Sequence, residues 1–261
     1  MPTILVGTDL TERSRPAIVR GVELVQAFGG RLIVCHATPQ ALPVNPLFPH
    51  QTGESIAQTA STEQRIIDAV TEQVVGATAH REFDVVVDFG EAPDVICSQA
   101  TRLRADLIVV MNDRPGLGEV ARDLAASPCS VLLLGTSTGS AVAIVTLESE
   151  TGSVASLAQD ARAVLVRPVS KFTVIMWTDS DEKKAPLLAE LERTSRTIGV
   201  PFEPWFADLT ERGALARAAS DPEIGLVALT APQPDKIVER RASPLDDGLE
   251  GATASFLLLR R

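Results

Sequence analysis

Residues 4–39 read ILVGTDLTERSRPAIVRGVELVQAFGGRLIVCHATP, and this stretch decides the fold. It opens on a short apolar run, which is typical of a buried strand. The next segment, 14–28, repeats apolar residues at helical spacing, and Gly29 and Gly30 then end it. A second apolar run follows at 31–37. This order predicts a βαβ unit, in which two parallel strands share a covering helix.

The same alternation continues through the first half of the chain. The prolines of residues 38–55 predict an irregular surface loop, because proline lacks the backbone N–H that regular structure needs. Beyond this loop, the patterns predict helices at 62–77, 93–104 and 118–127 and strands at 81–89, 106–111 and 130–134. These strands are apolar on both faces, which is typical of a parallel sheet covered by helices on both sides.

The order of elements returns in the second half. Small residues at 135–141 indicate a connection, so the predicted domains are 1–137 and 138–261. Strands are expected at 141–147, 171–178, 201–207, 224–230 and 254–260, and helices at 153–166, 181–199 and 211–220. The end of the first half, 121–135, also resembles the end of the second, 245–260. The sequence therefore predicts an α/β protein of two tandem doubly wound domains, each with a five-stranded parallel sheet and helices on both faces.

The composition argues against several classes of protein. A formal net charge of −10 leaves few cations to displace counterions from phosphates, so nucleic acid binding is not expected. No apolar run approaches the ~20 residues that cross a bilayer, and the first residues lack the pattern of a secretory signal. We therefore expect a cytoplasmic protein without membrane insertion. The three cysteines show no metal-ligand spacing, so no metal site is expected.

These patterns together resemble the universal stress protein family. Residues 4–39 are similar to the family's opening, in which the first strand ends in Asp, Ser and Ala begin a helix, and the second strand ends in His. Residues 85–111 resemble the third and fourth strands, and 127–134 the fifth. The resemblance covers 1–135 and extends to 141–261 only as an order of elements. It implies a tandem protein with a degenerate second domain.

The resemblance directs attention to the loop after the fourth strand, because family members either bind ATP or bind no nucleotide. Binders carry Gly, two residues, Gly, nine residues and then Gly-Ser or Gly-Thr, whose backbone N–H groups reach the phosphates. Here Met111 and Arg114 stand at the first two glycine positions, three residues precede Gly118, and Glu119 replaces the hydroxyl residue. A carboxylate about 4 Å from a phosphate oxygen costs roughly 4 kcal/mol at an effective dielectric near 20. We therefore expect a truncated phosphate loop that does not bind ATP.

Positions that match the family's motif define a candidate ligand site in the first domain. They are Thr8, Asp9, Ala37, Val110, Arg114, Gly116, Gly118 and Glu119. The resemblance implies that Asp9 contacts an adenosine, but Asp9 also suits the cap of the turn that follows it. Ala37 and Val110 match adenine-lining positions and fit equally well as core residues. Arg114 and the N–H groups of the following helix start leave weak anion binding open.

No catalytic constellation is apparent in the sequence. His36 ends an apolar strand, where a hydrogen-bonded structural histidine is commoner than a general base. Ser14 is typical of a helix start rather than of a nucleophile. The acidic run at 177–184 could attract a cation but is more typical of a helix N-terminus. We expect no enzyme and assign no cofactor; AMP and ATP are the nucleotides left to test.

Two functions are expected. The first is a non-catalytic binding or regulatory scaffold in stress response. Its fifth-strand edges, Val131–Leu134 and Phe256–Leu259, are expected to pair with each other as a pseudo-dimer within one chain, with a second copy or with protein partners. The alternative is a sensor that binds an adenosine-containing or other small anionic ligand in the first domain. A third hypothesis, an enzyme of a related nucleotide-binding group, lacks a P-loop to support it.

Overall fold

The computed structural model describes residues 1–38, 52–112, 124, 127–146, 154–177, 181–207, 213–230 and 252–260. The chain divides into two compact units, Met1–Met111 and Asn112–Arg261, which we call unit 1 and unit 2. The predicted domains, 1–137 and 138–261, follow the repeat of elements instead and stay a prediction. The fifth strand of the first repeat lies in unit 2.

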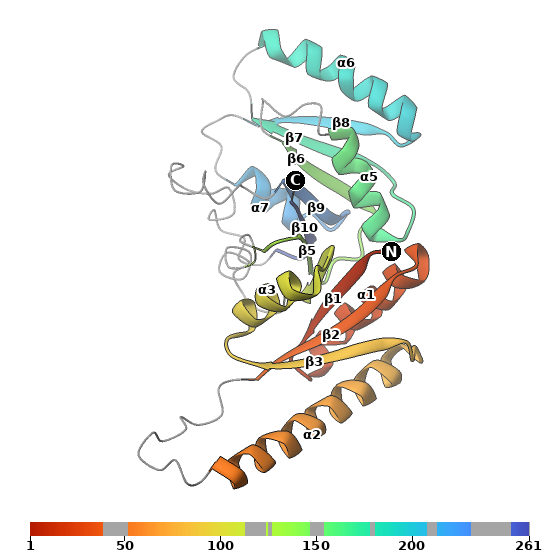
Figure 1. Cartoon of the computed structure of the whole chain (residues 1–261). Helices are drawn as coiled ribbons and strands as arrows, with labels where there is room; N and C mark the ends of the chain where they lie inside the picture. The colour runs from red at the N-terminus through yellow and green to blue at the C-terminus, as the bar shows by residue number, and fades with distance from the viewer. Residues whose placement is uncertain are drawn as a thin grey trace. The chain divides into compact units, whose positions relative to one another are not determined.

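Unit 1 contains a parallel sheet with the strand order β3-β2-β1-β4 (Figure 1). Its elements are β1 (Thr3–Thr8), the 3-10 turn η1 (Glu12–Ser14), α1 (Arg15–Phe28), β2 (Arg31–Thr38), α2 (Thr52–Thr78), β3 (Phe83–Phe89), α3 (Ala92–Leu103) and β4 (Leu107–Met111). The apolar runs of the sequence become these strands, which confirms a parallel α/β fold. Gly29 ends α1 with a φ of +66°, a conformation that L side chains rarely adopt.

The first residues of α2 correct the sequence prediction. The helix begins at Thr52, whereas the sequence predicted a loop over 38–55 and a helix from 62. Residues 54–61 read ESIAQTAS, which contains no proline and several good helix formers. The helix therefore begins three residues after Pro49, the last proline of the expected loop. Proline is the residue of that stretch that disfavours a helix most strongly.

Successive residues of β1 show how helices cover both faces of this sheet. A Cβ on Gly21 of α1 would lie 2.4 Å from Val6 Cγ2, so α1 packs on the face that Val6 presents. A Cβ on Gly7 would lie 3.0 Å from Ile96 Cδ1 of α3, so α3 packs on the opposite face. Between them lies a fully buried core that includes Leu5, Ile18, Leu24, Leu32, Ile33 and Ile108.

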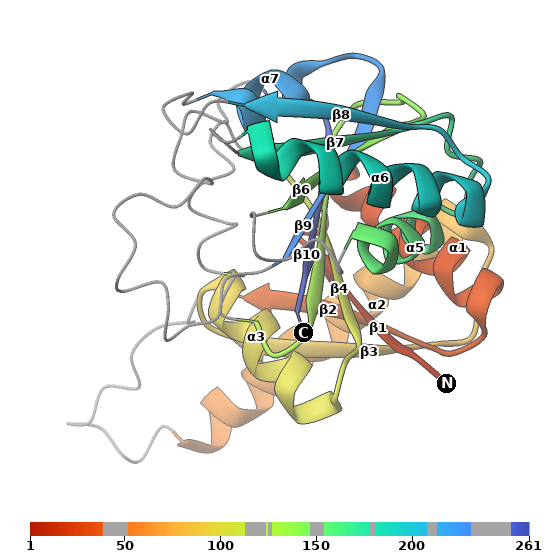
Figure 2. The same ribbon diagram turned by 90° about the horizontal axis from the view of Figure 1, so that it is seen from above.

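Unit 2 repeats this order of four strands and also contains the fifth strand of each repeat, β5 and β10. Its elements are β5 (Ser130–Leu134), β6 (Ala141–Thr146), α5 (Val154–Leu165), β7 (Phe172–Trp177), α6 (Asp181–Ile198), β8 (Phe202–Ala207), α7 (Ala214–Ser220), β9 (Ile224–Thr230) and β10 (Ser255–Leu259). The sheet order is β5-β10-β9-β6-β7-β8, in which β8, β7, β6 and β9 stand as β3, β2, β1 and β4 do in unit 1. Helices α5 and α6 lie side by side (Figure 2).

The two predicted fifth strands pair with each other inside unit 2. β5 and β10 are antiparallel, with Leu132 opposite Leu257 at the centre of the pairing. Both leucine side chains are fully buried. The other β-pairs of unit 2 are parallel. The predicted strand at 201–207 is also present as β8. Pro204 is tolerated there because β8 is the end strand of the sheet that the described residues form.

Candidate functional site

The candidate site of unit 1 lies where the parallel strands end at their carboxyl termini. Thr8 ends β1, Ala37 and Thr38 end β2, and Val110 precedes the last residue of β4. The sheet therefore places four of the predicted residues, Thr8, Asp9, Ala37 and Val110, at one edge. Arg114, Gly116, Gly118 and Glu119 lie outside the described residues, as does most of the helix expected at 118–127.

Asp9 is exposed and forms the turn that follows β1. Its carboxylate accepts hydrogen bonds from the Thr11 N–H at 2.9 Å and from the Thr11 hydroxyl at 2.8 Å. Partial burial raises the pKa of Asp9, but the hydrogen bonds from Thr11 and Ser14 outweigh it and leave the pKa below its ordinary value. In this structure Asp9 therefore caps the turn that follows β1, which was the alternative to a contact with adenosine.

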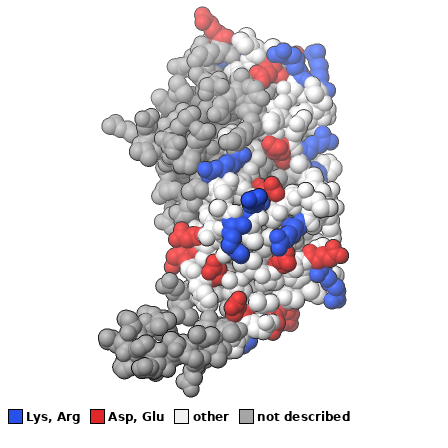
Figure 3. Space-filling model, in the orientation of Figure 1, with Lys and Arg blue, Asp and Glu red and all other residues white. Residues whose placement is uncertain are grey.

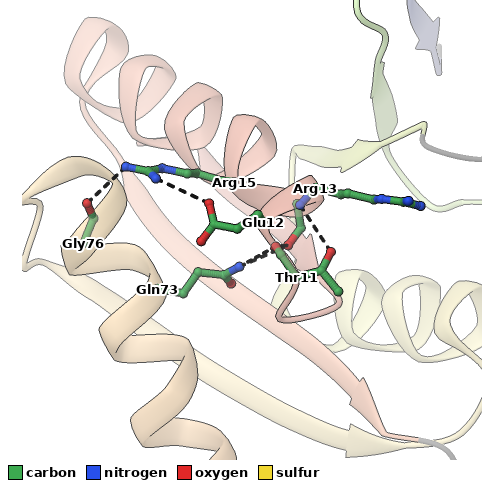
Figure 4. Close-up of polar contacts among 7 residues, drawn as sticks. Thr11, Glu12, Arg13, Arg15, Gln73 and Gly76 are labelled. Carbon is green, nitrogen blue, oxygen red and sulfur yellow. Dashed lines mark hydrogen bonds and ion pairs between the residues drawn. The ribbon is translucent and has the colours of Figure 1, made fainter.

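Thr8 is buried and faces the helices α1 and α2. Its hydroxyl donates to Gln73 Oε1 at 2.7 Å, lies 2.9 Å from the Ser14 hydroxyl and accepts the Leu10 N–H at 3.1 Å. Gln73 in turn donates from Nε2 to the Thr11 carbonyl at 2.8 Å (Figure 4). The Thr8 hydroxyl therefore joins β1 to α2, and Gln73 is a central polar residue of this edge.

His36 lies beside Thr8 on the neighbouring strand. Its Nδ1 is 2.9 Å from the Thr8 carbonyl oxygen, and a carbonyl only accepts, so Nδ1 carries the proton. This contact agrees with a hydrogen-bonded structural histidine. Ser14 directly precedes α1, but its hydroxyl donates to the Thr11 carbonyl at 2.9 Å and makes no capping hydrogen bond to the helix.

Ala37 and Val110 lie on the other face of the sheet, beneath α3. Val110 is buried, and a Cβ on Gly7 would meet its Cγ1 at 2.8 Å, so the valine packs over the glycine. Ala37 pairs in register with Asp88 of β3. Val110 is thus a core residue here, and Ala37 is a small half-buried residue beside a carboxylate.

Asp88 belongs to a polar chain that the sequence analysis missed. Gln99 of α3 donates from Nε2 to Asp88, and Arg102 donates from Nε to Gln99 Oε1 at 2.7 Å. The buried Cys35 thiol lies in the field of this chain: burial and the Asp88 charge raise its pKa to about 12, against a smaller opposing effect of Arg102. The available signal was an aspartate within the apolar run 83–89, although its partner on α3 lies eleven residues further along the chain.

The Thr38 hydroxyl at this edge lacks a hydrogen-bond partner among the described residues. Thr38 Oγ1 is buried and makes no hydrogen bond in the described part of the chain. It ends β2 on the face that also carries His36. An unpaired buried hydroxyl is costly unless a further group satisfies it, so Thr38 is a polar group available to a ligand.

Unit 2 differs from unit 1 at the corresponding strand positions. In unit 1, Gly7 of β1 pairs in register with Cys35 of β2. At the corresponding pair of unit 2, Val145 of β6 faces Ile175 of β7, and both are buried. Val145 and Ile175 are larger than Gly7 and Cys35, so they fill more of the space above the sheet. At this pair of positions the sheet of unit 2 therefore carries bulkier side chains than the sheet of unit 1.

Other kinds of site find little support among the described residues. No group of three His, Cys, Asp or Glu side chains could hold a metal ion there. None of the helices in the described ranges is long and apolar enough to span a bilayer. On the face shown in Figure 3, charged side chains of both signs are interspersed among neutral ones.

Comparison with known proteins agrees with this fold. The universal stress protein family model matches residues 1–135. A crystal structure of a universal stress protein from Archaeoglobus fulgidus DSM 4304 is 13% identical, covers 99% of this chain and 96% of that chain, and gives a TM-score of 0.68. A universal stress protein in complex with cAMP is 24% identical over 52% of this chain and 98% of its own, with a TM-score of 0.39.

A universal stress protein family protein from Arabidopsis thaliana with AMP bound is 16% identical over 51% of this chain and 90% of its own, with a TM-score of 0.31. Comparison with curated protein sequences finds no significant match. The family model spans more than half of the 261 residues, and the fold has the expected parallel sheet. The chain belongs to the universal stress protein family.

Proposed function

We propose that this universal stress protein is a cytoplasmic, non-catalytic binding protein of the stress response that does not hold ATP as the family's ATP binders do. The observation that carries the proposal is the Asp9 carboxylate, whose oxygens accept hydrogen bonds from the Thr11 N–H and hydroxyl. An adenosine hydroxyl at Asp9 would share the carboxylate with these bonds or compete with them. The sequence after β4 supports the same conclusion, because its glycine spacing is short and Glu119 follows Gly118.

The pairing of β5 with β10 supports a scaffold role. In this family, domains commonly associate through the edge of the fifth strand, as the resemblance implies. Here the buried Leu132 and Leu257 make that contact within one chain. Because the two fifth strands already bond to each other, we expect protein partners to bind elsewhere than at Val131–Leu134 and Phe256–Leu259, where the sequence analysis placed them.

The polar groups at the site support the absence of catalysis. His36 Nδ1 is held by the Thr8 carbonyl, and the Ser14 hydroxyl donates to the Thr11 carbonyl. Neither group is arranged as a base beside a nucleophile. We expect no release of phosphate from ATP above the rate of a blank without protein; release that disappears on substitution of a residue at this edge would contradict the proposal.

Calorimetry with ATP, ADP and AMP tests the loss of nucleotide binding. We expect Kd values weaker than about 1 mM for ATP, which corresponds to less than about 4 kcal/mol of binding free energy. A loop-repaired variant, with Met111 and Arg114 changed to Gly, residues 115–117 extended to nine residues and Glu119 changed to Ser, is expected to gain ATP binding. Micromolar ATP binding by the natural chain that Asp9→Ala abolishes and Asp106→Ala retains would overturn the proposal.

A second function is favoured by Thr38. Its buried hydroxyl, which has no partner in the described part of the chain, supports a sensor that binds an adenosine-containing or other small anionic ligand at this edge. The sensor predicts that native mass spectrometry of the purified protein detects a retained small molecule, and that Thr38→Val reduces its occupancy. Absence of any adduct, together with no heat from AMP, adenosine or cAMP, leaves the scaffold as the function.

A further inference from the structure

We propose that Gln73 makes α2 the responding element of the Asp9 turn, so that any group engaging Asp9 changes the stability of this helix. The inference concerns conformational coupling and does not depend on which ligand or partner the protein takes. Three observations carry it: the closed state of the turn, its backbone conformation and the path from the turn to α2.

Hydrogen bonds between Asp9 and Thr11 close the turn that follows β1. The carboxylate accepts from both donors of Thr11, its N–H and its hydroxyl. A ligand hydroxyl or ammonium group that takes the lone pairs to which Thr11 donates therefore competes with Thr11. Because Asp9 is exposed, such a donor reaches it from solvent without disturbing the core. Engagement of Asp9 at those lone pairs is therefore expected to weaken the turn.

The turn also holds a residue in an unfavourable backbone conformation. Leu10 has a φ of +64°, in the left-handed region that a leucine rarely adopts. Bonds on both sides maintain it, since the Leu10 N–H donates to the Thr8 hydroxyl at 3.1 Å and Thr11 is held by Asp9. A strained residue kept in place by its neighbours gives the turn a tendency to relax once those bonds are lost.

Gln73 connects this turn to α2 through both ends of its side-chain amide. Nε2 donates to the Thr11 carbonyl at 2.8 Å (Figure 4). Oε1 accepts the Thr8 hydroxyl at 2.7 Å. The orientation of the amide is fixed, because the Thr11 carbonyl can only accept. Movement of Thr11 therefore breaks a bond of Gln73, and the effect passes to a residue 62 positions away in the sequence.

Hydrogen exchange followed by mass spectrometry on peptides of α2 tests the coupling. We expect Asp9→Ala to speed hydrogen exchange in residues 66–78 by about fivefold. This is the change in rate that the loss of one hydrogen bond of ordinary strength would produce. Gln73→Leu, which keeps the shape of the side chain but removes the amide, is expected to produce a similar increase. In the Gln73→Leu background, Asp9→Ala should add nothing in α2, since the path is already cut.

The matched control is Asp106→Ala. Asp106 Oδ2 accepts the Thr3 N–H at 2.7 Å, so this change also removes a carboxylate bond to the backbone of β1, but at the opposite end of the strand. It should leave α2 exchange unchanged. Asp9→Asn, which keeps an acceptor oxygen for Thr11, gives the same test without deleting the side chain and should speed exchange less than Asp9→Ala does.

Two results would overturn the proposal. In the first, Gln73→Leu speeds exchange while Asp9→Ala leaves α2 as in the natural chain, so that Gln73 is only a structural link. In the second, the effects of Asp9→Ala and Gln73→Leu multiply in the double variant, so that the two residues act independently. If Asp9→Ala fails to fold, as circular dichroism would reveal, Thr11→Val replaces it in the same comparison.

Discussion

The backbone N–H of Gly135 donates a hydrogen bond to the Ser255 hydroxyl at 3.1 Å, and the same contact recurs with the roles of the two strands exchanged. The Arg260 N–H donates to the Ser130 hydroxyl at 3.3 Å. Each serine opens one strand, and each donor follows the other. The β5–β10 pairing is therefore self-complementary about Leu132 and Leu257, as an interface between two identical subunits would be.

Leu257→Ala should destabilise the chain by about 2–5 kcal/mol, because the side chain is fully buried and its removal leaves a cavity. Ser255→Ala removes one hydrogen bond from Gly135 and should cost about 1 kcal/mol. Urea unfolding followed by circular dichroism measures both values. Equal small losses for the two variants would argue against the β5–β10 pairing.

Gly21→Ala should destabilise unit 1 by about 1–3 kcal/mol, since its Cβ would lie 2.4 Å from Val6 Cγ2 in a packed core. Gly76→Ala is the matched control, because it also lies within a helix but its Cβ would meet nothing within 4 Å. The control should stabilise the protein by about 0.5–1 kcal/mol. Thermal unfolding of the two variants should therefore move the midpoint in opposite directions.

The lowered pKa of Asp9 predicts a specific dependence of stability on pH. A carboxyl group whose folded pKa lies below its unfolded value, here near 3.8, stabilises the folded state above that value. The stabilisation disappears as the pH falls through the folded pKa. The natural chain should therefore be more stable than Asp9→Asn at about pH 6, and the difference should shrink below about pH 3.8. A difference between the two urea midpoints that does not change with pH would contradict this assignment.

Cys35 should resist alkylation in the native protein. Its thiol is buried, and its pKa of about 12 keeps it protonated far above the ordinary 9.0. Iodoacetamide at about pH 8 should label the partly exposed Cys97 and Cys129 before Cys35, as peptide mass spectrometry can read out. Because the folded thiol stays neutral, this residue should also lower stability as the pH rises from 9.0 towards 12. Early labelling of Cys35 in the folded chain would refute its burial.

Local sequence patterns predicted most of the helices and strands. They could not predict the hydrogen bonds between segments that are distant in the sequence. Apolar runs such as 107–111 and 255–259 identify strands because burial demands such residues wherever they fall. The start of α2 at Thr52 was missed because the residues after Pro49 carry no apolar periodicity, although nothing in them forbids a helix.

The candidate site was predictable only in part. Asp9 was predicted because it directly follows the first strand. Its turn with Thr11 was predictable because an Asp side chain often accepts a hydrogen bond from the backbone N–H two residues further on. Gln73 could not be found, because its partners lie 59 to 65 residues away and a glutamine on a helix carries no local signal. Asp88 and Gln99 meet only once α3 packs on the sheet.

The strand β5 has a consequence for the way this gene can be divided. It belongs to the first repeat by sequence, yet it bonds to the last strand of the second. A fragment ending at residue 137 would present a bare apolar edge, and a fragment starting at residue 138 would present the complementary one. Produced apart, the pieces should precipitate or seek each other; produced together from a split gene, they should recombine without a covalent link.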